Sequence, residues 1–152
     1  MMNNNQNDNT TLPISERSRE VVAKMKEHNL LSIGKGEGDS NNKDIYLLAI
    51  ALGLENPTDK MSRPESWTRT VNFGGFDKSL VKAAFLGTAT DGDDISKYCD
   101  VREAFSYCKM LTDAGFIEID KFAQDATYDP ELMVKKMLEY VDSVYDEVIS
   151  ST

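Results

Sequence analysis

The densest group of residues able to do chemistry is the run Asp91-Gly92-Asp93-Asp94. Hard cations such as Mg²⁺ and Ca²⁺ take carboxylate oxygens as ligands, so Asp91, Asp93 and Asp94 are a candidate metal site. The spacing does not fit an EF-hand loop, which needs a glycine at the sixth position and a glutamate at the twelfth. The same residues suit a turn that ends in a helix N-cap, because carboxylates accept hydrogen bonds from the free N–H groups there. The sequence favours the turn and leaves the cation site as the alternative.

Nucleophilic and acid–base catalysis have few candidate residues in this chain. The single histidine, His28, would have to meet Cys99 or Cys108 in space to form a Cys–His pair. Any two of the 26 acidic residues could form a catalytic pair, but no spacing selects two of them. The glycine-rich segment 34–38 lacks the Gly-Lys-Ser/Thr ending of a phosphate-binding loop. The sequence therefore favours a protein that is not an enzyme and uses no cofactor.

One cluster combines basic and aromatic residues: Lys60, Arg63, Trp67 and Arg69. Aromatic rings stack on bases and cationic side chains hold phosphates, so this segment is a possible nucleic-acid contact. The net charge of −9 disfavours nucleic acid as the partner, because phosphate binding needs a basic surface. The competing interpretation is a surface connector whose Trp67 packs on the core.

The segment 129–149 is predicted to be a long amphipathic helix. Asp129 suits the N-cap and Pro130 the first helical turn. Apolar side chains recur at helical spacing and form a broad face, which Leu138 widens. The predicted interaction face consists of Met133, Met137, Tyr140, Val141, Val144, Tyr145 and Val148. If the preceding helices close a core by themselves, this face is free to bind a protein partner or a second copy of the chain.

The elements that must position these residues are mostly helices. Apolar periodicity predicts five helices: from Pro13 or Ser15 to 29, 44–54, 78–87, from Ile95 or Asp100 to 114, and 129–149. The second helix is apolar on nearly all sides, so we expect it in the middle of the core. Gly115 suits the left-handed position after the fourth helix. Two short strands, 67–73 and 116–119, are predicted to pair with each other.

Length and composition indicate one domain. The chain has 152 residues, of which 40% are hydrophobic, which is enough for a single core. The asparagine-rich residues 1–12 are predicted to be a disordered polar leader, followed by one helical domain over 13–152. The predicted fold class is mostly α, with about five helices and a minor two-stranded β element.

The N-terminus and the cysteines predict a cytoplasmic protein that does not enter a membrane. The first residues lack the hydrophobic region of a signal peptide, and no apolar run approaches 18 residues. Cys99 and Cys108 are nine positions apart in one predicted helix, hence about 13 Å apart and too distant for a disulfide.

The charge is divided unevenly along the chain. Residues 1–70 hold ten acidic and nine basic side chains, whereas residues 71–152 hold sixteen acidic and eight basic ones. An acidic half with regularly placed carboxylates can imitate the phosphates of DNA. An acidic DNA mimic that inhibits a DNA-binding protein is therefore an alternative function.

A series of short motifs, most of them hydrophobic, runs through residues 44–119. They are the run 44–54, Arg63-Pro64, the run 83–88, the acidic turn at 91–94, Glu103-Ala104-Phe105 and the run 114–117. In order and spacing, over about half of the chain, they resemble the small accessory proteins encoded beside bacterial and archaeal DNA phosphorothioation (Dnd) systems. The leader, the helix after Asp129 and the wider acidic turn depart from the family pattern.

The resemblance implies an accessory role near DNA sulfur modification or the restriction linked to it, in defence against foreign DNA. It transfers no catalytic residues. The sequence as a whole favours a non-enzymatic protein-interaction module in such a system. The alternatives are the acidic DNA mimic and a DNA-binding accessory protein that uses the segment from Lys60 to Arg69.

Overall fold

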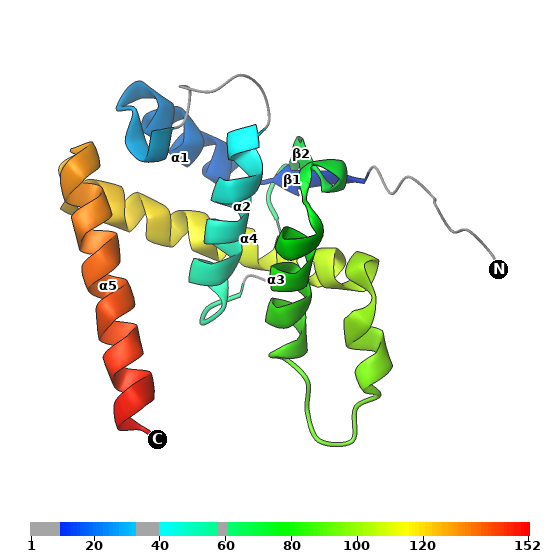
Figure 1. Cartoon of the computed structure of the whole chain (residues 1–152). Coiled ribbons are helices and arrows are strands. Elements are labelled where there is room, and N and C mark those ends of the chain that lie inside the picture. The colour runs from blue at the N-terminus through cyan, green and yellow to red at the C-terminus, as the bar shows by residue number, and fades with distance from the viewer. Residues whose placement is uncertain (1–9, 33–39, 58–60) are drawn as a thin grey trace.

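The computed structural model describes residues 10–32, 40–57 and 61–152. These residues form five α-helices, three short 3₁₀ helices and a two-stranded sheet (Figure 1). In chain order the elements are β1 (Thr11–Ile14), α1 (Glu16–Glu27), η1 (Leu30–Ser32), α2 (Ser40–Gly53), β2 (Glu65–Arg69), η2 (Thr70–Asn72), α3 (Gly75–Leu86), η3 (Ile95–Cys99), α4 (Val101–Asp125) and α5 (Pro130–Ser150). The predicted fold class, mostly α with five helices and a minor two-stranded element, is confirmed.

Helix α4 is the axis on which α1, α2 and α3 pack. In Figure 1 it passes behind α2 and α3 along the width of the molecule. The crossing of α2 and α4 is very close, because each helix has a glycine at the contact. A Cβ on Gly115 would lie 1.7 Å from the carbonyl oxygen of Ala49, and a Cβ on Gly53 would lie 1.9 Å from that of Leu111. As expected, α2 lies in the middle of the core, with Tyr46 and Ala49 fully buried.

The prediction that the fourth helix ends at 114 and is followed by a strand is wrong. Helix α4 continues through Gly115 to Asp125, and Phe116 and Ile119 are fully buried helical residues. The physical reason is that Gly115 serves the close approach of α2 rather than a left-handed helix end. In a sequence, a glycine required for packing cannot be distinguished from a glycine at a C-terminal cap.

The two strands pair differently from the prediction. Strand β2 is antiparallel to β1, with Thr11 opposite Arg69 and Ile14 opposite Glu65. Leu12 and Ile14 are buried in the core. Residues 11 and 12, predicted as part of the leader, therefore belong to the folded domain, and residues 1–9 lie outside the described part of the chain.

Helix α1 begins directly after Ser15, the second of the two expected starts. The Ser15 hydroxyl accepts a hydrogen bond from the Ser18 N–H at 3.1 Å, and the Ser18 hydroxyl donates to the Asp113 carboxylate at 2.7 Å. These bonds tie the start of α1 to α4. At the other end of α1 the ring of His28 is exposed and stacks on Tyr128, with the ring centroids 4.6 Å apart.

The two cysteines lie in different elements, contrary to the prediction of one common helix. Cys99 ends η3 and is exposed, whereas Cys108 is a buried residue of α4. Asp100 separates the two elements because its extended backbone caps α4, accepting hydrogen bonds from the N–H groups of Arg102 and Glu103. Both cysteines are free thiols. Of the helices described, none combines the length and the hydropathy required to cross a lipid bilayer.

Candidate protein-interaction surface

Helix α5 contacts the rest of the described structure only near its N-terminal end. Met133 is fully buried, Met137 packs against the core, and the Tyr140 ring meets the Phe122 ring of α4 edge-on at 5.6 Å. From Val141 onward every residue of α5 is exposed. Figure 1 shows α5 extending away from α4 on the side of the molecule opposite to α3.

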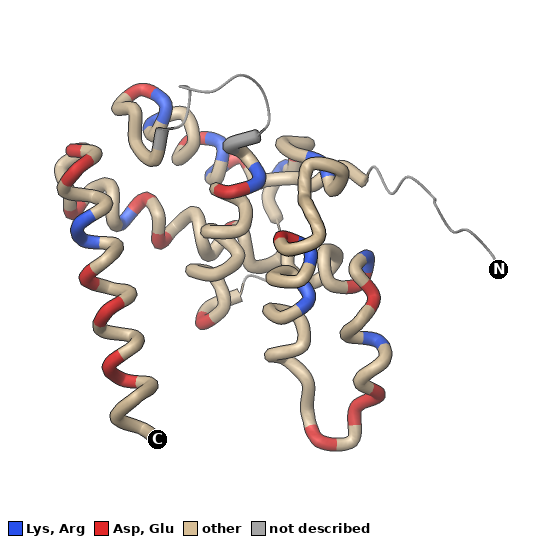
Figure 2. Tube along the Cα trace, in the orientation of Figure 1, with Lys and Arg blue, Asp and Glu red and all other residues tan. Residues whose placement is uncertain are grey.

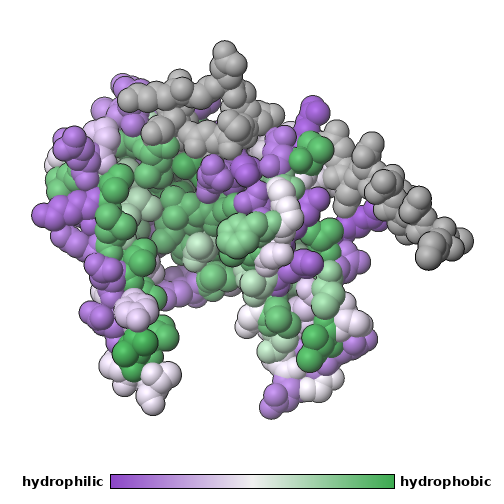
Figure 3. Space-filling model, in the orientation of Figure 1, coloured by the Kyte–Doolittle hydropathy of each residue, from purple (hydrophilic) through white to green (hydrophobic). Residues whose placement is uncertain are grey.

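The exposed part of α5 carries large apolar side chains on one side. Val134, Leu138, Val141, Tyr145, Val148 and Ile149 are each 46% to 64% exposed. The first five follow one another at intervals of four, three, four and three residues, so they form a single line along the helix. We call these five residues the α5 seam. Figure 3 shows hydrophobic surface along this helix.

The predicted interaction face divides into two strips, of which only one is free. Met133, Met137 and Tyr140 face the helix's own domain, because the first turns of α5 close the core against α4 and η1. Met133 in particular is not available to a partner, contrary to the prediction. Val144 lies between the two strips and is 37% exposed.

The remaining predicted residues, Val141, Tyr145 and Val148, belong to the seam. Val134 and Ile149, which are also exposed, were not among the predicted residues. Helical periodicity identifies the apolar half of a helix but not the part of that half that its own domain covers.

A second apolar surface lies between α2 and α3. It is a groove of about 330 Å³, lined only by aliphatic side chains: Leu47, Ile50, Ala51, Leu54, Leu80, Val81, Ala83 and Ala84. Leu54 and Leu80 are close to half exposed at its rim. Figure 3 shows hydrophobic surface in the hollow between α5 and α3. This groove can accept apolar side chains but offers no polar group to orient a small molecule.

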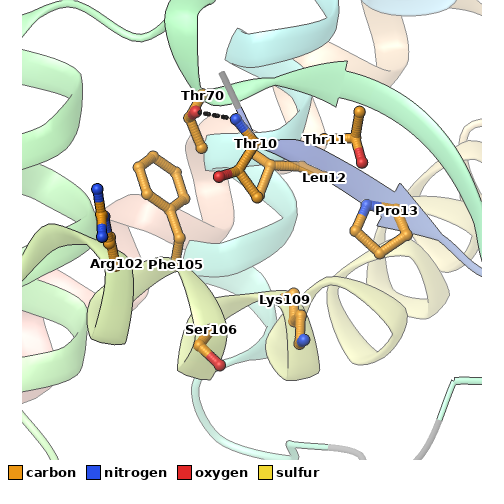
Figure 4. Close-up of a pocket in the computed structure, with 9 residues that line it drawn as sticks. All are labelled: Thr10, Thr11, Leu12, Pro13, Thr70, Arg102, Phe105, Ser106 and Lys109. Atoms are coloured by element: carbon orange, nitrogen blue, oxygen red, sulfur yellow. Dashed lines mark hydrogen bonds between the residues drawn. The ribbon is translucent and has the colours of Figure 1, made fainter. Parts of the chain in front are cut away.

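A third, more polar pocket of about 330 Å³ lies between β1 and α4 (Figure 4). Three consecutive turns of α4 contribute Arg102, Phe105 with Ser106, and Lys109, and the backbone N–H of Thr10 donates to the Thr70 hydroxyl at 3.0 Å on the opposite wall. Two cationic side chains with an aromatic ring between them suit a small ligand that carries an acidic group. This pocket was not predictable from the sequence, because residues 11 and 12 of β1 were predicted as part of the leader.

The described members of the basic–aromatic cluster, Arg63, Trp67 and Arg69, have different surroundings. Trp67 is half-buried against the core, with its ring 5.7 Å from that of Phe116, and it lies in strand β2 rather than in a connector. The Arg63 guanidinium donates to the Glu16 carboxylate at 3.2 Å. Arg69 is exposed on β2, and Lys60 lies outside the described residues, as does the glycine-rich segment 34–38.

The acidic turn at 91–94 is held together by its own hydrogen bonds. The Asp93 carboxylate accepts from the Thr90 N–H and the Tyr98 hydroxyl, both at 2.7 Å, and these bonds hold the pKa of Asp93 at about 2. Asp94 caps η3 by accepting from the Ser96 N–H at 3.0 Å, and hydrogen bonding with Ser96 lowers its pKa. The favoured interpretation, a turn that ends in a helix cap, is confirmed. Across the described ranges, no three His, Cys, Asp or Glu residues are grouped so that they could hold a metal ion.

The fold and its surfaces define a mostly α-helical protein with two exposed apolar surfaces, the α5 seam and the α2–α3 groove. Neither a family model, nor a curated protein, nor a solved structure matches the chain.

Proposed function

We propose that this chain is a non-enzymatic accessory protein that works by binding other proteins, in a system of DNA phosphorothioation or the restriction linked to it. The observation that carries the proposal is the apolar side of α5, which its own domain leaves exposed over several helical turns. The connection with DNA sulfur modification rests on the resemblance of residues 44–119 to Dnd-associated accessory proteins.

The size of the exposed surface supports a binding role. The six exposed apolar side chains of α5 together present roughly 600 Å², at about 100 Å² each, whereas the largest apolar patch on a typical monomer is about 300–600 Å² and is often functional. At about 25 cal/mol per Å², covering this surface favours association by up to about 15 kcal/mol. Association itself costs about 4–15 kcal/mol. A helix face of this size can therefore hold a partner when a few further contacts are made.

Co-expression with the phosphorothioation and restriction proteins of a Dnd system tests the proposal. The tagged wild-type chain is compared with a variant carrying Val141→Asp and Tyr145→Asp in the seam, and with the matched control Ser143→Asp on the polar side of the same helix. We expect the wild type and the control to retain a Dnd component and the seam variant to lose it. Circular dichroism checks that all three chains are folded, which the exposure of the substituted residues favours.

Two results contradict different parts of the proposal. If the seam variant captures as much of the Dnd component as the wild type does, α5 is not the binding surface. If no Dnd component is captured by the wild type, the link to DNA phosphorothioation is wrong.

The alternative of an acidic DNA mimic has one observation in its favour. Acidic side chains recur along the exposed length of α5, as Figure 2 shows, and they are Glu131, Glu139, Asp142, Asp146 and Glu147. A protein that imitates DNA binds its target through charge, so its affinity falls steeply between 50 and 200 mM salt. Docking through the apolar seam depends little on salt, so the same capture experiment at two salt concentrations separates the two functions.

A further inference from the structure

We propose that the α5 seam pairs with the α5 seam of a second copy of this chain, in an antiparallel two-helix coiled coil. This inference rests on the proposed function, since it takes α5 as a protein-binding surface and names its first occupant. Its support is the spacing of the seam, the arrangement of charge along α5 and the area that the pairing covers.

The spacing of the seam is that of a two-stranded coiled coil. Intervals of four, three, four and three residues give an average period of 3.5, which keeps one apolar line facing a partner helix. Val134, Val141 and Val148 recur every seven residues, with Leu138 and Tyr145 between them. Helix α5 has 21 residues and is therefore about 31 Å long. All five positions of the line are exposed in the single chain, so the pattern is not explained by packing within the domain.

The charges on α5 favour the antiparallel direction. Its only basic residues, Lys135 and Lys136, lie in the first half, where they offset Glu131 and Glu139, and Lys135 lies 3.9 Å from the Glu139 carboxylate; the second half carries only the acidic Asp142, Asp146 and Glu147. Parallel helices would place the acidic halves side by side, which is repulsive. Antiparallel helices place the lysines of each copy beside the carboxylates of the other.

One register satisfies both the apolar seam and the charges. When Leu138 of one copy lies opposite Val141 of the other, the helices overlap over nearly their whole length. Lys135 and Asp142 each directly follow a seam valine, so they occupy the same flank of the seam. In antiparallel coiled coils, residues on this flank of the two helices face each other. Lys135 of each copy then lies beside Asp142 of the other, and the two-fold axis repeats the ion pair.

The opposite flank of the seam is apolar in this register. Met137 directly precedes Leu138, and Val144 directly precedes Tyr145, so they lie on the other side of the line. In the register above, the half-buried Met137 of one copy, which also packs against its own core, turns its remaining exposed part to Val144 of the other. The seam and this flank together bury roughly 600 Å² on each copy, at the lower end of stable interfaces, which bury about 1,200–2,000 Å² in total. A symmetric pairing of identical surfaces is also the commonest form of homodimer.

Light scattering after size exclusion and sedimentation equilibrium on the full chain measure the proposed dimer. We expect the mass to approach twice the monomer mass of 17.0 kDa as the protein concentration rises from 1 to about 200 µM. Val141→Asp lies at the centre of the seam and is expected to give a monomer, while the matched control Ser143→Asp stays dimeric. A wild-type chain that remains monomeric at 200 µM, or a dimer that Val141→Asp leaves intact, overturns the inference.

Charge reversal tests the direction and the register. Lys135→Glu and Asp142→Lys are each expected to weaken the dimer by about fivefold to tenfold, because each creates two like-charged pairs. The double variant recreates both pairs with opposite sign and is expected to recover the wild-type dissociation constant. If the double variant instead weakens the dimer by as much as the two single substitutions combined, the antiparallel pairing is wrong.

The failure of this inference and the failure of the proposed function give different results. A monomer that still captures a Dnd component through the seam contradicts only the self-pairing. A dimer that captures no such component leaves the pairing in place and contradicts the accessory role.

Discussion

The buried side chains near the crossing of α2 and α4 show that one residue can define how two helices meet. Gly53 and Gly115 each allow the backbone of the other helix to approach a position that a Cβ would occupy. Tyr46 and Cys108 are buried, and burial raises the pKa of both groups, that of Cys108 to about 12. None of these roles has a local sequence signal, because each depends on a residue more than fifty positions away.

Gly115→Ala is expected to destabilise the protein by about 2–4 kcal/mol, because the new methyl group must displace the backbone of Ala49. Gly75→Ala is the matched control, since a Cβ there meets nothing within 4 Å. Urea denaturation measures both changes. Similar stability of the two variants would show that α2 and α4 do not cross as closely as the structure places them.

Stability is expected to fall at alkaline pH through Cys108 and Tyr46. The folded state keeps the Cys108 proton up to a pH of about 12, whereas the unfolded thiol, with a pKa near 9.0, releases it. The unfolded state then binds fewer protons, so stability is unaffected below pH 8 and decreases from about pH 9 upward. The urea midpoint at pH 7.5, 9 and 10.5 measures this change. A midpoint that stays constant over the three values contradicts it, and Cys108→Ala is expected to flatten the fall in part.

At the scale of elements, the starts of α1 and α5 were predictable, whereas α2 and α3 begin at Ser40 and Gly75, before the expected positions 44 and 78, and long-range pairings were not predictable. Ser15 and Asp129 are caps whose side chains bond to the free N–H groups of the first turn, a signal contained within four residues. The pairing of β1 with β2 joins segments more than fifty residues apart, and short strands carry no record of their partner. The same limit applies to α5. Its sequence shows which half of the helix is apolar, but which part of that half is covered depends on packing against α4.

The turn between α4 and α5 contains a strained backbone that predicts a stabilising substitution. Thr127 and Tyr128 both have positive φ, at 51° and 58°, which β-branched and bulky residues seldom adopt. Asparagine tolerates this conformation better, so Thr127→Asn is expected to raise stability by about 0.5–1 kcal/mol. Thermal unfolding followed by circular dichroism measures the effect. A lower melting temperature for Thr127→Asn than for the wild type contradicts strain at this position.

At the scale of the whole molecule, α5 differs from the other helices in how much of it is supported. Its first turns belong to the core, and every residue of its second half is exposed among the described parts of the chain. Isolated helical turns are marginally stable in water, so the second half gains most from a partner. The acidic side chains and the apolar seam lie on the same helix, so α5 combines the proposed binding surface with much of the exposed negative charge.

Hydrogen exchange is expected to report this division directly. At low micromolar concentration the amides after Val141 exchange much faster than those of α4, because their opening exposes no core. At about 200 µM the proposed pairing protects them, while α4 is unchanged. Exchange after Val141 that is equally slow at both concentrations would show that the end of α5 is stabilised within one chain.

The central position of α4 has a consequence for the order in which the protein is made. The helix begins at Val101, so its packing partners leave the ribosome before the residues that bury them. At about 5–20 residues per second, on the order of ten seconds pass between the synthesis of Leu12 and that of Asp125. During this interval Leu12, Tyr46 and Phe73 have no α4 to pack against, so the core of the domain can close only after α4 has been made.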